Sequence, residues 1–574
     1  MKLSEITACI PPHVMDQLIE DPVWNGARRQ GMTWLQAQTQ AEVLATARAE
    51  LPLEAQDVLK LIVSRFGVGR FGLEQLMREA SSGLWSGTEL RYGLEFLHSC
   101  GIVWCMKIGW GEQAYLLPED TFRLWLREFY PADLEPLPAS DPVKRLPAER
   151  IEGGLCCELL HTMAALVRLG FSWTRSRTLP KRVLQRLESQ LQLPEAAARG
   201  LPLLGGLSTD SYPPRVAWLL DLSLMQGWLS EGEEGYIFHE QCWQAWLDQA
   251  PHACEAALAD LVLSDYLAAE DGRSYPAAVL AEQPAGVWFL TQELEEWVYK
   301  AAGYQARHQA ASSCQDLLDR LTGLGWMEQG HTVDGRGAYR LLHAQARPAE
   351  PLRIQLSGEL IVTRETPLQV RWLLEMSADR VSHDLFTQYK VTSDSLIGAY
   401  RRGLTVDTLL ADLREAAGGM LEPAFAELLQ QWASDWLVEK ESPQLDRARA
   451  SQNSHSDRNR AAASPDFLEP CDKPSLSRLL PELPRLPIAW SAAMRSYHPS
   501  TAREMIEAAV HCQLPLQLNR QAELTVLIPD EVQELDGAWM VSGRVRGAGR
   551  SEPEHVQLPP DAWQEMKLLL PDPR

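Results

Sequence analysis

Five basic residues gather in one short stretch of the chain, where their charges suit contact with phosphate groups. They are Arg175, Arg177, Lys181, Arg182 and Arg186, around the sequence Arg-Ser-Arg-Thr-Leu-Pro-Lys-Arg that begins at position 175. Clustered Lys and Arg side chains attract a nucleic-acid backbone through their local field. A solvated helix start has the same composition, so both interpretations stand at this point.

A formal G-x-G-x-x-G pattern, from Gly67 to Gly72, raises the question of dinucleotide binding. That function requires a strand before the pattern and an acidic residue that ends a second strand about twenty residues later. Residues 58–65 suit a helix at least as well as a strand, and Glu89 begins a helix instead of ending a strand. We therefore expect no nucleotide and no other cofactor.

One cluster offers four soft metal ligands in a short span, and zinc takes four such ligands. The chain has no C-x-x-C pair, and Trp243 and Trp246 favour an ordinary core helix. We expect no metal at the cluster, which consists of His239, Cys242, His252 and Cys254.

Signatures of catalysis are missing from the sequence. A nucleotide-driven motor needs a phosphate-binding loop of the form G-x-x-x-x-G-K-[ST], and no such loop occurs. The G-x-S-x-G, H-E-x-x-H and protein-kinase patterns are also missing. We expect a protein that is not an enzyme and acts by binding.

The overall charge limits the choice of partners. The 574 residues carry a formal net charge of −23, which repels the phosphate backbone, so any nucleic-acid contact must come from a local basic patch. Ten cysteines without a disulfide-like spacing suit a reducing compartment, and no apolar run approaches the length of a membrane span. These features predict a cytoplasmic protein with no membrane partner.

Residues 51–130 have the pattern of a winged helix. Helices are expected over 55–64, 73–80 and 89–99, followed by apolar runs at 102–108 and 113–117 that suit a hairpin. If the domain reads DNA, its third helix enters the major groove, with Arg91 as the candidate contact. Because Glu89 and Glu95 make that helix nearly neutral, packing or protein contact is the favoured use.

The remaining patterns predict a multidomain chain that is mainly α with α/β parts. Residues 1–50 form a helical N-terminal segment, 148–250 a helical domain and 251–347 a second winged-helix-like domain. Residues 441–475 contain too few apolar side chains to fold and are expected to be a disordered linker. Residues 476–574 form a small β-rich module with a helix over 500–511 and turns at Pro529 and Gly537.

Residues 352–440 have the most specific order of signals. A strand is predicted over 354–363, a helix after Pro367, and a second strand over 386–391. Thr392 or Ser393 should cap the next helix, Gly403 should end it, and Thr405 should cap another. A last helix buries apolar residues between 425 and 436.

This stretch resembles the helicase-associated domain found in the N-terminal part of XPB-type helicases and in stand-alone bacterial relatives. The matching elements are Q-x-x-x-x-L-I-V at 355–362, Y-K-V-T-x-x-S-L-x-x-A at 389–399 and G-L-T-V-D-T-L-L-A-D-L at 403–413. The resemblance implies a domain that accompanies a motor without being one. The stand-alone relatives tend to carry an element similar to T-L-P-K-R-x-L, here at 178–184. The C-terminal module faintly resembles a WYL-type SH3-like barrel, although the Trp-Tyr-Leu residues are absent.

Together these features predict a non-catalytic, helicase-associated protein. It would bind DNA through the basic cluster and bind a helicase or another DNA-processing protein. The alternative is a winged-helix transcription regulator whose C-terminal barrel senses a ligand.

Overall fold

The computed structural model describes residues 1–80, 85–108, 112–207, 211–267, 274–303, 307–342, 350–355, 358–363, 365–383, 386–419, 421–440, 468–469, 481, 483–520, 523–535, 538–546 and 554–571. The chain forms two compact units. The first unit comprises Met1–Asp133, Lys300–Tyr304 and Asn459–Arg574, and the second comprises Leu134–Tyr299 and Gln305–Arg458. About 51% of the chain is helical and 17% is strand, which confirms the predicted mixed class with a β-rich C-terminal region. No helix within the described ranges combines the length and apolar content of a membrane span.

Three helices and a hairpin form the body of residues 51–130, which we call the first module. The helices are α6 (Leu53–Arg65), α7 (Leu73–Ala80) and α8 (Gly87–Ser99), and the hairpin consists of β1 (Trp104–Ile108) and β2 (Glu112–Leu116). A single bridge joins Phe71, between α6 and α7, to Tyr115 of β2. The three predicted helices are therefore present, and a helix, not a strand, precedes the G-x-G-x-x-G pattern.

Short helices of the N-terminal segment accompany this module. They are α1 (Leu3–Cys9), α2 (Pro12–Ile19), α3 (Asn25–Arg29), α4 (Trp34–Gln38) and α5 (Ala41–Glu50), and α9 (Glu119–Phe129) follows the hairpin. Trp24 is fully buried and its indole N–H donates to the Cys100 carbonyl at 2.9 Å. Burial of apolar surface and a satisfied indole N–H together tie the segment to the module.

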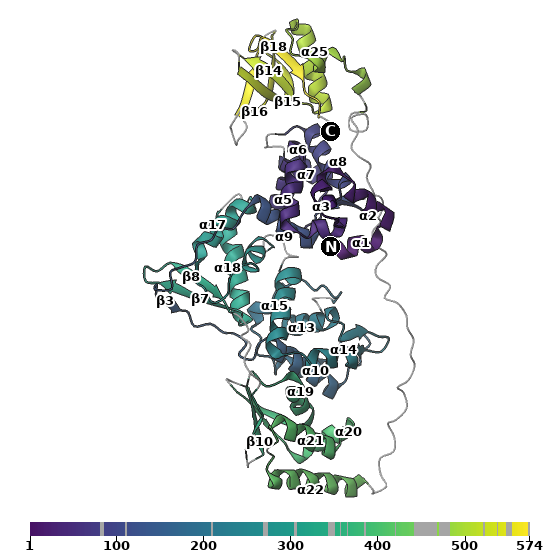
Figure 1. Ribbon diagram of the computed structural model, residues 1–574, viewed down its shortest axis with the longest axis vertical. Helices are drawn as coiled ribbons and strands as arrows, with labels where there is room; N and C mark the ends of the chain where they lie inside the picture. The colour runs from purple at the N-terminus through teal and green to yellow at the C-terminus, as the bar shows by residue number, and fades with distance from the viewer. Residues whose placement is uncertain are drawn as a thin grey trace. The chain divides into compact units, whose positions relative to one another are not determined.

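A five-stranded antiparallel sheet and one helix make up the C-terminal module. Helix α25 (Pro499–Cys512) lies along the sheet, whose strand order is β17-β16-β15-β14-β18 (Figure 1). Pro529 was predicted to lie in a turn, but it lies within β15 at a register shift. Proline is tolerated at such a bulge because no ladder N–H is needed there. The strands are β14 (Leu516–Arg520), β15 (Glu523–Leu535), β16 (Ala538–Arg546), β17 (Glu554–Leu558) and β18 (Glu565–Leu568).

The predicted linker and turn fall mostly outside the described residues. Of 441–475, only Leu468 and Glu469 are described, and Gly537 is not. These two linker residues form β13, which pairs with the outer edge of β1. The expectation of disorder is therefore wrong for this dipeptide, because an open strand edge supplies backbone partners that composition does not reveal.

Residues 148–250 of the second unit, the middle module, have the order of the first module with one additional short helix, α12 (Glu195–Ala198). A bridge between Ser172 and Gly235 takes the place of the Phe71 bridge. The domain predicted to be helical therefore also contains a hairpin. Its elements are α10 (Leu155–Leu169), α11 (Lys181–Glu188), α12 (Glu195–Ala198), α13 (Pro214–Met225), β4 (Leu229–Glu231) and β5 (Tyr236–Phe238), and α14 (Glu240–Leu247) follows.

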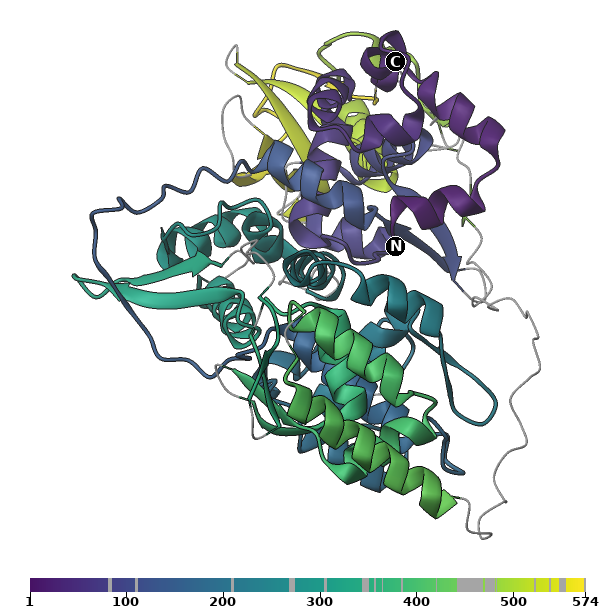
Figure 2. The ribbon, with the colours of Figure 1, turned by 60° about the horizontal axis from the view of Figure 1, so that its bottom comes forward.

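In residues 251–347, the third module, the same order begins at α16 (Ser274–Leu280), and α15 (Pro251–Leu261) precedes it. Strand β6 (Phe289–Leu290) pairs with β8, and β3 (Val143–Arg145) extends the sheet in the order β3-β7-β8-β6. The hairpin projects away from the helices (Figure 2). The other elements are α15 (Pro251–Leu261), α16 (Ser274–Leu280), α17 (Thr291–Ala301), α18 (Arg307–Gly323), β7 (Met327–Thr332) and β8 (Gly337–Leu341).

Residues 352–440 form a four-stranded antiparallel sheet with helices. The strand order is β11-β12-β10-β9, and Leu360 lies opposite Tyr389 in a buried core. Thr392 and Thr405 cap their helices as predicted. The elements are β9 (Arg353–Ile354), β10 (Glu359–Val362), α19 (Leu368–Ser377), β11 (Asp379–His383), β12 (Thr387–Lys390), α20 (Ser393–Arg401), α21 (Val406–Ala416) and α22 (Pro423–Lys440).

Candidate nucleic-acid interface

The basic cluster lies on α11 and on the loop that leads into it. Val183 and Leu187 of α11 are buried, whereas the five basic side chains are all exposed. The loop closes on itself, because the Thr174 N–H donates to the Thr178 carbonyl at 2.8 Å. Arg177 adopts a left-handed backbone with φ 57°, and its guanidinium lies 5.2 Å from the Trp173 ring. Because the apolar side chains of α11 face inward, its basic side chains lie together on the exposed face.

The charges of this cluster are not neutralised by the chain itself. Across the described residues, none of the five basic side chains pairs with a carboxylate. Lys181 and Arg182 occupy the first turn of α11, where the positive end of the helix dipole disfavours cations. Local stability therefore does not explain their position, whereas an anion at this helix start would gain from both cations and the dipole.

An acidic hairpin tip borders one side of the cluster. The Trp173 N–H donates to the Glu234 carbonyl at 2.9 Å, and Glu233 and Glu234 are exposed. A phosphate near Arg175 would therefore approach carboxylates as well as cations. We expect the strongest anion contacts on the α11 side, at Lys181 and Arg182.

Arg91 lies in the first unit, on α8, and does not belong to the α11 cluster. It is half-buried, and its Nε has no hydrogen-bond partner. Nine other residues of α8 are buried, including Thr88 and Glu89 at its start. The face that a reading helix would present to DNA is therefore largely covered.

The C-terminal module covers the start of α8. The Thr88 N–H donates to the Gln513 carbonyl at 3.2 Å, and the Thr88 hydroxyl donates to the Cys512 carbonyl at 2.6 Å. Glu89 pairs with Arg546 at 3.1 Å, and burial raises the pKa of this glutamate above its ordinary value. Sequence reasoning missed these contacts, because nothing local marks Gln513 or Arg546 as partners of residues more than 400 positions away.

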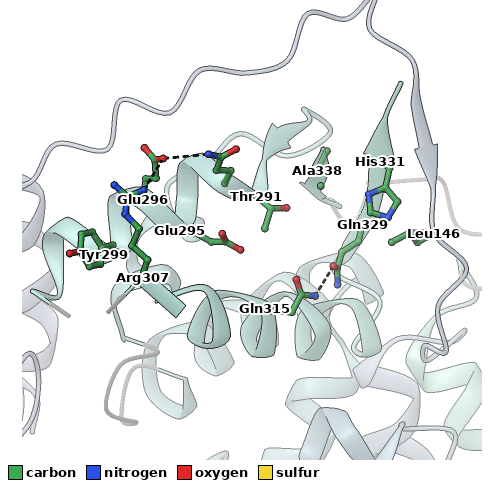
Figure 3. A pocket seen from close by; sticks show the side chains of 13 residues that line it. Leu146, Thr291, Glu295, Glu296, Tyr299, Arg307, Gln315, Gln329, His331 and Ala338 are labelled. Carbon is green, nitrogen blue, oxygen red and sulfur yellow. Dashed lines mark hydrogen bonds and ion pairs between the residues drawn. The ribbon is translucent and has the colours of Figure 1, made fainter. Parts of the chain in front are cut away.

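A polar pocket in the third module offers a different chemistry. It has a volume of about 640 Å³ and is lined by α17, α18 and the β7–β8 hairpin. Glu295 and Gln315 point into it from the two helices (Figure 3). Glu296 pairs with Arg307 at 3.5 Å, and burial raises the pKa of Glu295. Because carboxylates repel phosphate, this concave face suits a cationic or neutral group better than a nucleic-acid backbone.

The four candidate zinc ligands, His239, Cys242, His252 and Cys254, differ in their surroundings. His239 Nε2 lies 2.8 Å from the Ser230 hydroxyl, Cys242 is exposed, and Cys254 is buried. Within the described ranges, no three His, Cys, Asp or Glu side chains gather around a common point for a metal.

Comparison of the sequence with models of known protein families and with curated proteins finds no match.

Proposed function

We propose that this protein is a non-catalytic binding protein that contacts DNA through the α11 cluster. The supporting observation is that five exposed cations project from one loop and helix of a strongly acidic protein, and none of them pairs with a carboxylate of the described residues. The two cations in the first turn of α11 are unfavourable for the helix dipole, but they give an acidic protein a local surface that binds anions.

The second part of the proposal is a protein partner, namely a helicase or another DNA-processing protein. It rests on the resemblance of residues 354–436 to the helicase-associated domain. Two of the matching segments begin helices capped by Thr392 and Thr405, as the sequence predicted. Cytoplasmic location belongs to the same proposal.

Binding to duplex DNA should be weak at physiological salt and should fall steeply as salt rises. Each phosphate neutralised by the cluster contributes roughly 0.9 to the negative slope of log affinity against log salt. Fluorescence anisotropy with labelled duplex DNA over a salt series measures the slope. A lack of binding even at low salt would contradict a DNA-contacting role.

The purified protein should not hydrolyse ATP. No phosphate-binding loop of the required form occurs, and the G-x-G-x-x-G pattern follows helix α6 instead of a strand. A phosphate-release assay across successive purification columns tests this expectation. Hydrolysis that persists through purification and disappears in a Gly67→Ala/Gly69→Ala variant would contradict it.

A transcription regulator built on winged helices is the second candidate. The supporting observation is the order helix, bridge or strand, helix, helix and hairpin, which occurs in the first and third modules and, with the extra short helix α12, in the middle module. DNA reading by the helix that precedes the hairpin has weak support in two modules, because α13 is buried over nine consecutive residues and the start of α8 contacts the C-terminal module. Sequence-specific binding in a competition assay with random duplexes would favour this candidate.

A further inference from the structure

Helix α19 has apolar residues outside the face that packs into the core of its domain. Leu374 belongs to the buried core of the 352–440 domain, and Val370 and Leu373 pack against that core. Trp372 and Met376 do not belong to that core, lie one helical turn apart and are only half-buried. A helix with a second apolar stripe usually has another surface to cover it.

This second stripe lies in a groove of about 640 Å³. Leu247 of α14 lines one part of the groove, and Leu404 and Ala416 line another. The Trp372 ring lies 5.2 Å from that of Trp243 in an edge-to-face arrangement, so the aromatic side chain is already held in place. A preordered aromatic surface loses little conformational entropy when a ligand binds, which is typical of strong contact sites in protein interfaces.

The wall of the groove that α21 supplies is acidic. Asp412 and Glu415 line it three residues apart, and both are exposed. Neither has an ion-pair partner in the described part of the chain. Partial burial, and then repulsion from Glu415, raises the pKa of Asp412. The third carboxylate of the groove, Glu350, already lies 4.0 Å from Arg353.

We infer that this groove binds a segment of a partner protein whose apolar side chains are flanked by Lys or Arg. The apolar side chains would cover Trp372 and Met376, and the cations would pair with Asp412 and Glu415. Electrostatic complementarity of this kind selects the partner and orients its approach. The inference rests on the proposed protein partner and gives its chemistry; it does not depend on DNA binding.

A library of random dodecapeptides displayed on phage and selected on the full-length protein tests the inference. We expect enriched peptides to combine apolar residues with Lys or Arg. Synthetic versions should bind an Asp412→Lys/Glu415→Lys variant at least about tenfold more weakly than the wild type, because two attractive charges become repulsive. A Glu422→Lys/Glu427→Lys variant, altered at exposed sites outside the groove lining, is the matched control and should retain affinity.

A second variant and a second assay separate this inference from the proposed function. Met376→Asp places a charge in the apolar stripe and should weaken the same peptides without altering DNA binding. Enrichment of acidic peptides, or equal loss of affinity in the control variant, would overturn the inference. A wild-type protein that binds these peptides but not duplex DNA would instead count against the α11 cluster alone.

Discussion

Replacing Arg177, Lys181 and Arg182 together by glutamate should abolish measurable DNA binding. The change removes three cations from the α11 cluster and places three carboxylates where a phosphate would lie. Loss of attraction and gain of repulsion act in the same direction, and each lost phosphate contact also lowers the salt slope by roughly 0.9. Anisotropy with duplex DNA at low salt measures the effect where binding is strongest.

The fold should survive this triple change. All three side chains are exposed, and substitutions of exposed charges usually alter stability by about 0.5 kcal/mol or less. The matched control is Arg353→Glu/Lys390→Glu/Arg414→Glu, which changes the net charge equally at exposed positions of the 352–440 domain. DNA binding that persists in the cluster variant, or is lost equally in the control, would remove α11 as the contact site.

Glu375→Ala should destabilise the second unit by about 3–5 kcal/mol, the range for breaking a buried charge network. Glu375 is 6% exposed, and the Tyr389 hydroxyl donates to its Oε1 at 2.9 Å. His161 Nε2 and an Arg380 nitrogen lie 3.5 and 3.8 Å from the same oxygen. Removing the carboxylate leaves these polar groups buried without their shared acceptor.

Urea unfolding followed by tryptophan fluorescence checks this value. Glu375→Gln should lose less stability, because its amide oxygen still accepts from Tyr389. Glu427→Ala, an exposed change on α22, serves as the control and should lie within about 0.5 kcal/mol of the wild type. An alanine variant at position 375 as stable as this control would show that the network contributes little.

This buried network also positions the groove. His161 belongs to α10 of the middle module, whereas Glu375 belongs to α19. Arg168 of α10 donates to the carbonyls of Glu375 and Ala378 near the end of α19, where the helix dipole favours a cation. The contacts between α10 and α19 thus hold the apolar stripe of α19 beside α14.

Local sequence patterns were sufficient for most helices and for several strands. The spacing of apolar residues predicted α6, α7 and α8. The position of a threonine just before each helix predicted the caps at Thr392 and Thr405. These features depend on neighbours within a few residues, so their physical cause is present in the sequence itself. The basic cluster was also visible, because its five charges lie within twelve consecutive positions.

Tertiary structure alone decided which surfaces remain available. Strand β11 is a polar edge strand without the alternation that marks a half-buried strand, so only its pairing with β12 reveals it. Pro529 continues β15 because a register shift accommodates its missing N–H. The sequence determined that α11 is basic and that α19 has excess apolar residues. Long-range packing decided that the α11 charges stay exposed and that the start of α8 contacts the C-terminal module. It also decided that the second face of α19 lines an acidic groove. Such contacts join residues far apart in the sequence, which the local spacing of apolar residues does not relate.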